Sequence, residues 1–185
     1  MNTDYKTMLI TGTTQGIGYQ LYKYYKDKYN IITINRQDIG DNNYVCDLSN
    51  MNEVRELISQ IASINVDILI NNAGGASPVH FLDMTIDELI AVSTLNYHTP
   101  ILLMQAVING MVNRGYGKII NISSIGSKSP RPLIAHYGAA KSALEKFSSS
   151  IAVAYGGTGV SVNCICPGGI NTKTSIENRK KMAEL

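Results

Sequence analysis

Short apolar runs alternate along the chain with longer segments whose apolar residues recur every three or four positions. The runs cover residues 7–10, 31–35, 44–46, 66–70, 117–124 and 160–165. Runs of this length, bounded by glycine and polar residues, predict strands. The run at 66–70 is apolar almost throughout, which is typical of a strand covered on both faces.

The segments between the runs have the spacing of amphipathic helices. One face is marked by Leu21, Tyr22 and Tyr25, then by Val54, Leu57, Ile58 and Ile61 in residues 51–63, and by Leu144, Phe147, Ile151 and Ala154 in residues 135–155. Residues 85–113 form a further helical region that Pro100 interrupts. The mixed-charge tail from Lys173 is also predicted to be helical.

Strands that alternate with helices of this length predict an α/β fold with right-handed crossovers. We expect a Rossmann-type, doubly wound parallel sheet of about six strands in a three-layer α/β/α arrangement. The pattern shows no internal repeat and no linker, so residues 1–185 are predicted to form one domain.

Composition and charge exclude several classes of function. The 185 residues are 44% apolar, and 16 basic against 14 acidic residues give a net charge of +2. Because no run of like charges occurs, we expect neither nucleic-acid nor membrane binding. No apolar run approaches the roughly 18 residues of a membrane span, and the first strand starts too early for a signal peptide, so a cytoplasmic protein is expected. Three scattered histidines and the cysteines Cys46, Cys164 and Cys166 lack metal-site spacing.

A glycine-rich turn joins the first strand to the first helix, through Thr11, Gly12, Thr13, Thr14, Gln15, Gly16, Ile17 and Gly18. Such a turn leaves free N–H groups at a helix N-terminus, where a phosphate binds favourably, and glycine lets the phosphate approach closely. The spacing differs from both G-x-G-x-x-G and the P-loop. A plain strand-to-helix connection is the alternative interpretation.

The end of the second strand bears on the choice of nucleotide. In a dinucleotide-binding domain this position faces the adenosine ribose, and it is Asn35, followed by Arg36. A neutral side chain beside a guanidinium favours a 2′-phosphate, and hence NADP(H) over NAD(H). Gln15 is uncharged where a second cation would strengthen the prediction, and Arg36 could instead be an ordinary surface residue.

Two further strand ends carry polar or small residues. Asp47, before Leu48, could accept a hydrogen bond from an adenine amino group or cap the next helix. The fourth strand leads into Asn71, Asn72, Ala73, Gly74 and Gly75. Small residues there leave room for a ligand at the carboxyl edge of the sheet. A tight turn whose asparagine side chains bond to the backbone is the alternative, and both can hold at once.

Candidate acid–base chemistry lies between Asn121 and Lys141. Tyr137 and Lys141 are four residues apart, so on a helix they share one face. The ammonium is expected to lower the pKa of the phenol, and Ser124 brings a hydroxyl to the same place. In the preceding helical region Pro100 cannot donate to the carbonyl of Asn96, which leaves that oxygen for another partner. A surface Tyr–Lys pair, and a Pro100 that merely separates two helices, are the alternatives.

Taken together, these residues resemble the short-chain dehydrogenase/reductase family over almost the whole chain. The matches are the T-G-x-x-x-G-I-G turn at 11–18, Asp47-Leu48, the N-N-A-G segment at 71–74, the tetrad Asn96, Ser124, Tyr137 and Lys141, and Pro167-Gly168 with Thr172. The resemblance implies that Pro167, Gly168, Ile170 and Thr172 lie beside the nicotinamide.

The resemblance also implies a reaction, the hydride transfer between NADP(H) and a small carbonyl or secondary-alcohol substrate. Tyr137 would exchange the proton with the substrate oxygen, which Ser124 would hold. Lys141 would bind the nicotinamide ribose, and the Asn96 carbonyl would hold a water in a proton relay.

The family pattern normally continues with a substrate-covering segment and a seventh strand, whereas here only residues 173–185 follow Thr172. The sixth strand would then be an edge, which native proteins usually cover. A shortened homo-oligomer, dimer or tetramer, and a part of a longer protein are both consistent with this pattern. A non-catalytic dinucleotide-binding module and another reaction on the same scaffold, such as halide elimination, remain alternatives.

Overall fold

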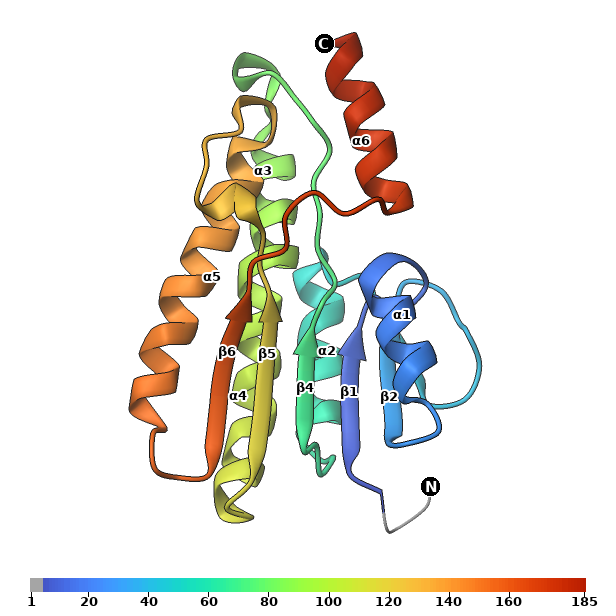
Figure 1. Cartoon of the computed structure of the whole chain (residues 1–185), viewed down its shortest axis with the longest axis vertical. Helices are drawn as coiled ribbons and strands as arrows, with labels where there is room; N and C mark the ends of the chain where they lie inside the picture. Colours follow the sequence, from blue (N-terminus) through green and yellow to red (C-terminus); the bar gives the residue numbers. More distant parts are fainter. Residues whose placement is uncertain (1–4) are drawn as a thin grey trace.

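Six parallel strands form the centre of the computed structural model, which describes residues 5–185 and so leaves the first four residues of the predicted domain undescribed. The strands are β1 (Thr7–Thr11), β2 (Asn30–Asn35), β3 (Asn43–Val45), β4 (Ile68–Asn71), β5 (Gly117–Ile122) and β6 (Val160–Ile165). They lie in the order β3-β2-β1-β4-β5-β6, and every neighbouring pair is parallel. Figure 1 labels the five strands from β2 to β6 of this order. This is the predicted Rossmann-type sheet.

Helices connect the strands, as the periodicity predicted. They are α1 (Gly16–Tyr25), α2 (Met51–Ile61), α3 (Ile86–Ser93), α4 (Thr99–Asn113), α5 (Ala135–Ala154) and α6 (Lys173–Glu184). Single turns of 3-10 helix lie at Phe81–Asp83, Ile125–Ser127 and Pro132–Ile134. Across residues 5–185, no helix combines the length and apolar character that a membrane crossing needs.

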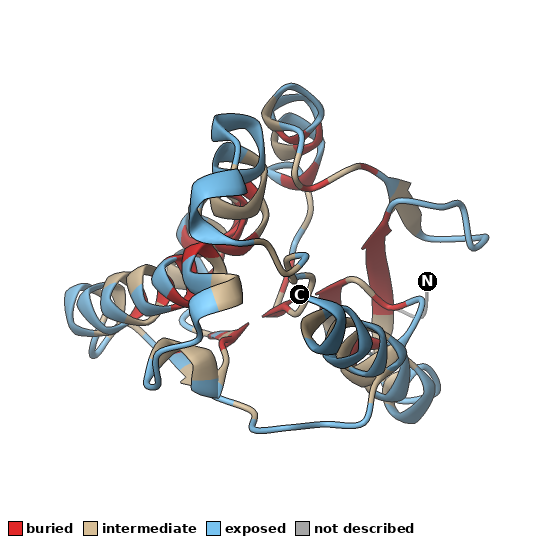
Figure 2. Ribbon diagram, turned by 90° about the horizontal axis from the view of Figure 1, so that it is seen from above, coloured by how far each residue is buried: buried red, intermediate tan, exposed pale blue. Residues whose placement is uncertain are grey.

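The sheet separates two apolar layers, so the fold is three-layered (Figure 2). On one face, Leu9, Leu69 and Ile119 of the strands pack with Val54 of α2 and Leu103 of α4 in one large core cluster. Side chains of α5 pack against the same cluster. On the other face, a smaller cluster joins residues of β1, β2, β4 and β5 to α1.

The chain order reverses between β1 and β4. Successive strands run from β1 outward to β3 on one side and from β4 outward to β6 on the other. At such a switch point the connections leave in opposite directions, and the carboxyl ends of the two strands open a ligand-binding crevice. The helix α6 lies beyond these carboxyl ends (Figure 1).

Candidate functional site

The glycine turn is shaped to receive a phosphate group. Gly12 (φ +70°) and Gly16 (φ +59°) adopt left-handed conformations that other residues rarely take. A Cβ on Gly18 would lie 2.1 Å from the Gly12 carbonyl oxygen, so the start of α1 packs directly on the turn. No side chain caps α1, and the Gln15 amide instead donates to Thr174 Oγ1 (3.0 Å). The first-turn N–H groups therefore suit an anionic ligand such as a dinucleotide pyrophosphate.

The side chains around this turn have different environments. Thr14 and Gln15 are exposed, whereas Ile17 packs against the smaller core cluster. Asn72 links the turn to the end of β4, because its amide donates to the carbonyl oxygens of Thr11 and Gly12, both at 2.9 Å. The backbone N–H groups of Asn72 and Ala73 both donate to Thr11 Oγ1. The asparagine-bonded turn that the sequence allowed is therefore present at the switch point.

Asn35 differs from the expectation that it faces a ribose. Its side chain is 4% exposed and points into the glycine turn. The Asn35 Oδ1 accepts from the Thr13 N–H (2.7 Å), and its Nδ2 donates to Thr13 Oγ1 (2.9 Å) and Asn43 Oδ1 (2.8 Å). Because these partners use the amide, Asn35 shapes the turn. The exposed Arg36 is left as the candidate for phosphate recognition.

Asp47 and Leu48 follow β3, after the carboxyl end of the strand. Asp47 Oδ1 accepts from the N–H and the hydroxyl of Ser49, at 2.9 and 2.7 Å. It does not cap α2, since Asn50 is the N-cap and accepts from the Asn52 N–H. The Leu48 side chain is buried in the core, and its carbonyl oxygen accepts from Thr99 Oγ1. The Leu48 side chain is therefore not available to a ligand.

Ser124 and Tyr137 form the candidate acid–base pair. Ser124 follows β5, and its Oγ accepts from the Gly126 N–H at 3.1 Å. Burial raises the pKa of the Tyr137 phenol, and the hydrogen bond with Ser124 opposes that shift. The sequence predicted a lowered pKa for Tyr137, whereas its pKa is raised. Desolvation disfavours the phenolate more than the Ser124 hydrogen bond stabilises it.

Lys141 follows Tyr137 by one helical turn, on the same side of α5. Its Nζ is 5.8 Å from the centroid of the Tyr137 ring and donates to the Ile122 carbonyl oxygen at 2.8 Å. The residue is 2% exposed, and this burial lowers the pKa of its ammonium to about 8. Tyr137 and Lys141 therefore share one face of the helix, as the sequence predicted. Lys141 is buried, so the alternative of a surface Tyr–Lys pair does not hold.

Asn96 belongs to a π-helical turn, Thr94–His98, between α3 and α4. The Thr99 N–H bonds to the Thr94 carbonyl, five residues back, so the helix widens just before Pro100. The buried Asn96 side chain holds the segment after β4, because its Oδ1 accepts from the Gly75 N–H (3.0 Å) and its Nδ2 donates to the Gly75 carbonyl (2.9 Å). The interruption is therefore more than a separation of two helices.

The segment from Pro167 to Thr172 passes across the same crevice. The Pro167 carbonyl accepts from the Ile125 N–H. This bond joins the segment to residues 123–128, the loop after β5 that contains Ser124 and is called the Ser124 loop below. Gly168 and Ile170 are exposed. Thr172 caps α6, and its methyl group would lie 3.2 Å from a Cβ placed on Gly16. The predicted nicotinamide-side residues and the glycine turn are thus close together.

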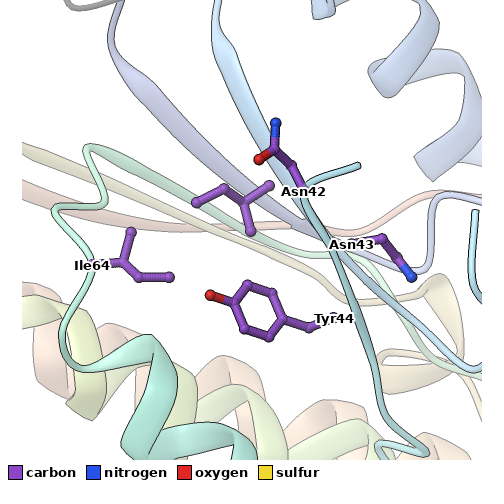
Figure 3. Close-up of a pocket in the computed structure, with 5 residues that line it drawn as sticks. Asn42, Asn43, Tyr44 and Ile64 are labelled. Atoms are coloured by element: carbon purple, nitrogen blue, oxygen red, sulfur yellow. The ribbon is translucent and has the colours of Figure 1, made fainter. Parts of the chain in front are cut away.

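A hollow elsewhere on the molecule contains none of these residues. It lies beside the start of β3 and is lined by Ile32, Asn42, Asn43, Tyr44 and Ile64 (Figure 3). A groove nearer the candidate site runs between the 126–132 loop and α5, with Lys128 and Arg131 in its lining. Lys128 pairs with Glu145, so its charge is partly neutralised. Sequence reasoning did not identify Glu145, whose carboxylate lies beside the Ser124 loop.

Comparison with known proteins agrees with this arrangement. A family model described as short chain dehydrogenase matches residues 6–183. The chain is 31% identical to the 3-oxoacyl-(acyl-carrier-protein) reductase FabG of Rickettsia typhi, over 97% of this chain and 78% of that protein. It is 33% identical to a Drosophila melanogaster protein described as dehydrogenase/reductase SDR family protein 7-like, over 70% of this chain but only 40% of that one.

Solved structures show the same likeness. A short chain dehydrogenase/reductase family protein superposes with a TM-score of 0.85 at 30% identity, covering 100% of this chain and 83% of that one. An actinorhodin polyketide ketoreductase, 24% identical, superposes with a TM-score of 0.87 over 98% of this chain and 77% of its own, and it supports the fold alone. The chain therefore belongs to the short-chain dehydrogenase/reductase family of NAD(P)-dependent oxidoreductases that act on CH–OH groups.

Proposed function

We propose that this protein interconverts a small carbonyl compound and its secondary alcohol with NADP(H). One observation carries the proposal. The Ser124 hydroxyl and the Tyr137 ring meet at Gly126, where a Cβ would lie 3.4 Å from Ser124 Oγ and 3.8 Å from Tyr137 Cε1. The buried Lys141 amine lies on the same face of α5 as Tyr137. This hydroxyl, phenol and amine stand at the carboxyl edge of the sheet, where parallel α/β sheets bind their ligands.

Tyr137 is suited to act as the acid in the reducing direction. Its raised pKa keeps the phenol protonated at neutral pH, so it can donate a proton to a carbonyl oxygen. Ser124 would hold that oxygen through its hydroxyl. In the oxidising direction the phenol must first lose its proton, so we expect alcohol oxidation to rise with pH through the alkaline range. When bound, the nicotinamide supplies or accepts the hydride.

The cofactor would lie along the residues described above. The N-terminus of α1 would hold the pyrophosphate, and Lys141 would hold the nicotinamide ribose. The exposed Arg36 supports NADP(H) over NAD(H), since a guanidinium binds a 2′-phosphate well. A 30% identical relative from Escherichia coli O157:H7 is named as an NADP-dependent 3-hydroxy acid dehydrogenase. A 28% identical structure is a 4-hydroxyisoleucine dehydrogenase with NADH, so both cofactors belong in the test.

The first substrates to test follow from the relatives. Several are named for 3-oxoacyl, acetoacetyl or 3-hydroxy acid compounds. We propose a small molecule with an oxygen at this β position. We also propose that the protein acts as a cytoplasmic homo-oligomer, which light scattering on the purified protein would test.

The test is a spectrophotometric assay with both cofactors and a panel of 3-oxo esters, ketones and aldehydes. Wild-type protein should oxidise NADPH in a substrate-dependent manner, and Tyr137→Phe should lower kcat by on the order of a hundredfold or more. Equal rates with Tyr137→Phe would refute the proposed role of the phenol. Tight NADPH binding without turnover of any substrate would instead support the non-catalytic dinucleotide-binding module.

A further inference from the structure

The carboxylate of Glu145 collects hydrogen bonds from three separate segments. Glu145 lies on α5, one helical turn beyond Lys141. Its Oε1 accepts from Ser123 Oγ at 2.5 Å, from Ser127 Oγ and from Cys166 Sγ at 3.2 Å. Its Oε2 accepts from the Lys128 ammonium. The carboxylate thus joins the end of β5, the 3-10 turn after it and the segment after β6 to α5.

These donors lie on both sides of Ser124. Ser123 is the residue immediately before it, and Ser127 is three residues after it. The Ser127 hydroxyl also lies 2.7 Å from the Ser124 carbonyl oxygen, its second possible acceptor. Ser124 is not among the hydrogen-bond partners of the carboxylate in the described part of the chain, and its Oγ accepts from the Gly126 N–H. The loop is therefore fixed on either side of Ser124, whose Oγ, like the Tyr137 ring, lies within 4 Å of a Cβ placed on Gly126.

The carboxylate is charged throughout the neutral range. Its side chain is only 12% exposed, compared with 59% for Lys128. Burial by itself raises the pKa of Glu145, but the hydrogen bonds from Lys128, Ser123, Ser127 and Cys166 outweigh it and lower the pKa to about 2. A charged acceptor with this many donors holds them more rigidly than a neutral one, because each hydrogen bond is charge-assisted.

We propose that Glu145 is a positioning residue for the reaction, whose carboxylate sets the distance between the Ser124 hydroxyl and the Tyr137 phenol by fastening the Ser124 loop to α5. The inference rests on the proposed roles of Ser124 and Tyr137. Tyr137 lies two helical turns before Glu145 on the same helix, so a loop tied to Glu145 keeps a fixed relation to the phenol. A positioning error of about 1 Å at such a pair can cost on the order of a hundredfold in rate.

The first experiment compares Glu145→Ala and Glu145→Gln with Glu56→Ala, an exposed glutamate on α2. We expect all three to remain folded by circular dichroism and to bind NADPH within about twofold of wild type. Glu145→Ala should lower kcat roughly ten- to hundredfold. Glu145→Gln, which can still accept hydrogen bonds, should recover part of that loss, and Glu56→Ala should have no effect.

A double-mutant cycle separates positioning from general destabilisation. If Glu145 acts through Ser124, Glu145→Ala should cause no further loss of kcat in a Ser124→Ala background. An equal fold-loss in both backgrounds would overturn the proposal. Ser127→Ala should lower kcat by a smaller factor, whereas Ser149→Ala, whose hydroxyl contacts only the main-chain carbonyl of Glu145, should match wild type.

A titration distinguishes failure of this inference from failure of the proposed function. The Tyr137 pKa is obtained from ultraviolet difference spectra between each protein and its Tyr137→Phe counterpart. Because the Ser124 hydrogen bond lowers the Tyr137 pKa, loosening the loop with Glu145→Ala should raise it. An unchanged Tyr137 titration would overturn the positioning role even if no substrate were turned over. A raised pKa without turnover by wild type would sustain the positioning and refute the reaction.

Discussion

At the residue scale, burial controls the protonation of the candidate site. Lys141 and Tyr137 lie side by side, and desolvation shifts each toward its neutral form. The pKa of the Lys141 ammonium falls to about 8, and that of the Tyr137 phenol rises. The two pKa values, close together for the free groups, therefore move apart. As the pH rises, the Lys141 ammonium should lose its proton well before the Tyr137 phenol does.

The Lys141 ammonium should make stability depend on pH. Its pKa is about 8 in the folded state against an ordinary value of 10.5, so the cost of burying the charge is fully present below pH 8. Between pH 8 and 10.5 the unfolded chain binds more protons, and the free energy of unfolding should rise, by about 3 kcal/mol. Urea unfolding of wild type and Lys141→Met at several pH values measures this contribution as their difference.

Comparison with the variant is needed because Cys46, with a pKa raised to about 11, has the opposite effect between pH 9 and 11. Lys146→Met, which removes an exposed lysine from the same helix, is the matched control and should follow wild type at every pH. If the free energy of unfolding of wild type and of Lys141→Met changed with pH in parallel, this would contradict a lowered pKa for the Lys141 ammonium.

Arg36 is expected to set the cofactor preference by itself, since Asn35 is used by the glycine turn. Arg36→Ala should raise the Kd for NADPH roughly ten- to hundredfold, the loss expected for one or two charge-assisted bonds to a phosphate. The Kd for NADH should change little. Fluorescence titration with both cofactors measures this, with Arg55→Ala on α2 as the control. Equal weakening of both cofactors would show that Arg36 does not read the 2′-phosphate.

At the scale of elements, the segment after β4 is packed closely against the π-helical turn and α5. A Cβ on Gly74 would lie 2.7 Å from Asn96 Oδ1 and 3.0 Å from Lys141 Nζ. Gly74→Ala should therefore displace both side chains and lower kcat roughly ten- to hundredfold. Gly156→Ala, whose new methyl group would make only ordinary contacts of 3.4 Å or more after the end of α5, should not change kcat. Steady-state kinetics of the two variants decide the matter, and similar kcat values would rule out this packing constraint.

The sequence predicted the elements well because burial and periodicity are local signals. All six strands were expected within two or three residues of their ends, as were the helices on either side of them. The region 85–113 was expected to be interrupted at Pro100, but the break begins earlier, at Thr94. Losing the prolyl N–H changes the hydrogen bonding of the preceding turn, so the effect extends toward the N-terminus.

The direction of particular side chains could not be predicted, because it depends on partners far away in the sequence. Asn35 was expected to face a ligand, but Thr13, 22 residues earlier, draws its amide inward. Glu145 looks like an ordinary polar position on an amphipathic helix, and only its contacts with Ser123 and Ser127 show its importance. A cluster of serines just after a strand was the one available signal.

At the scale of the whole molecule, the two faces of the sheet are covered unequally. The face that packs against α2, α4 and α5 contains most of the buried apolar residues. On the other face α1 covers the β1 and β2 side, whereas Lys118, Ser161, Asn163 and Ile165 of β5 and β6 are exposed. β6 is also an edge of the sheet. The helix α5, which carries Tyr137 and Lys141, is therefore held in place by packing on the well-covered face.

This asymmetry predicts different costs for two apolar truncations. Leu144 is 0% exposed and lies on α5, whose side chains pack against the large core cluster, so Leu144→Ala should lower the free energy of unfolding by about 2–5 kcal/mol. Ile165 of β6 is 51% exposed, so Ile165→Ala should cost less than about 1 kcal/mol. Urea unfolding at low protein concentration measures both. A large cost for Ile165→Ala that grows with protein concentration would mean that association of copies covers this face in solution, because only a partner would bury the side chain.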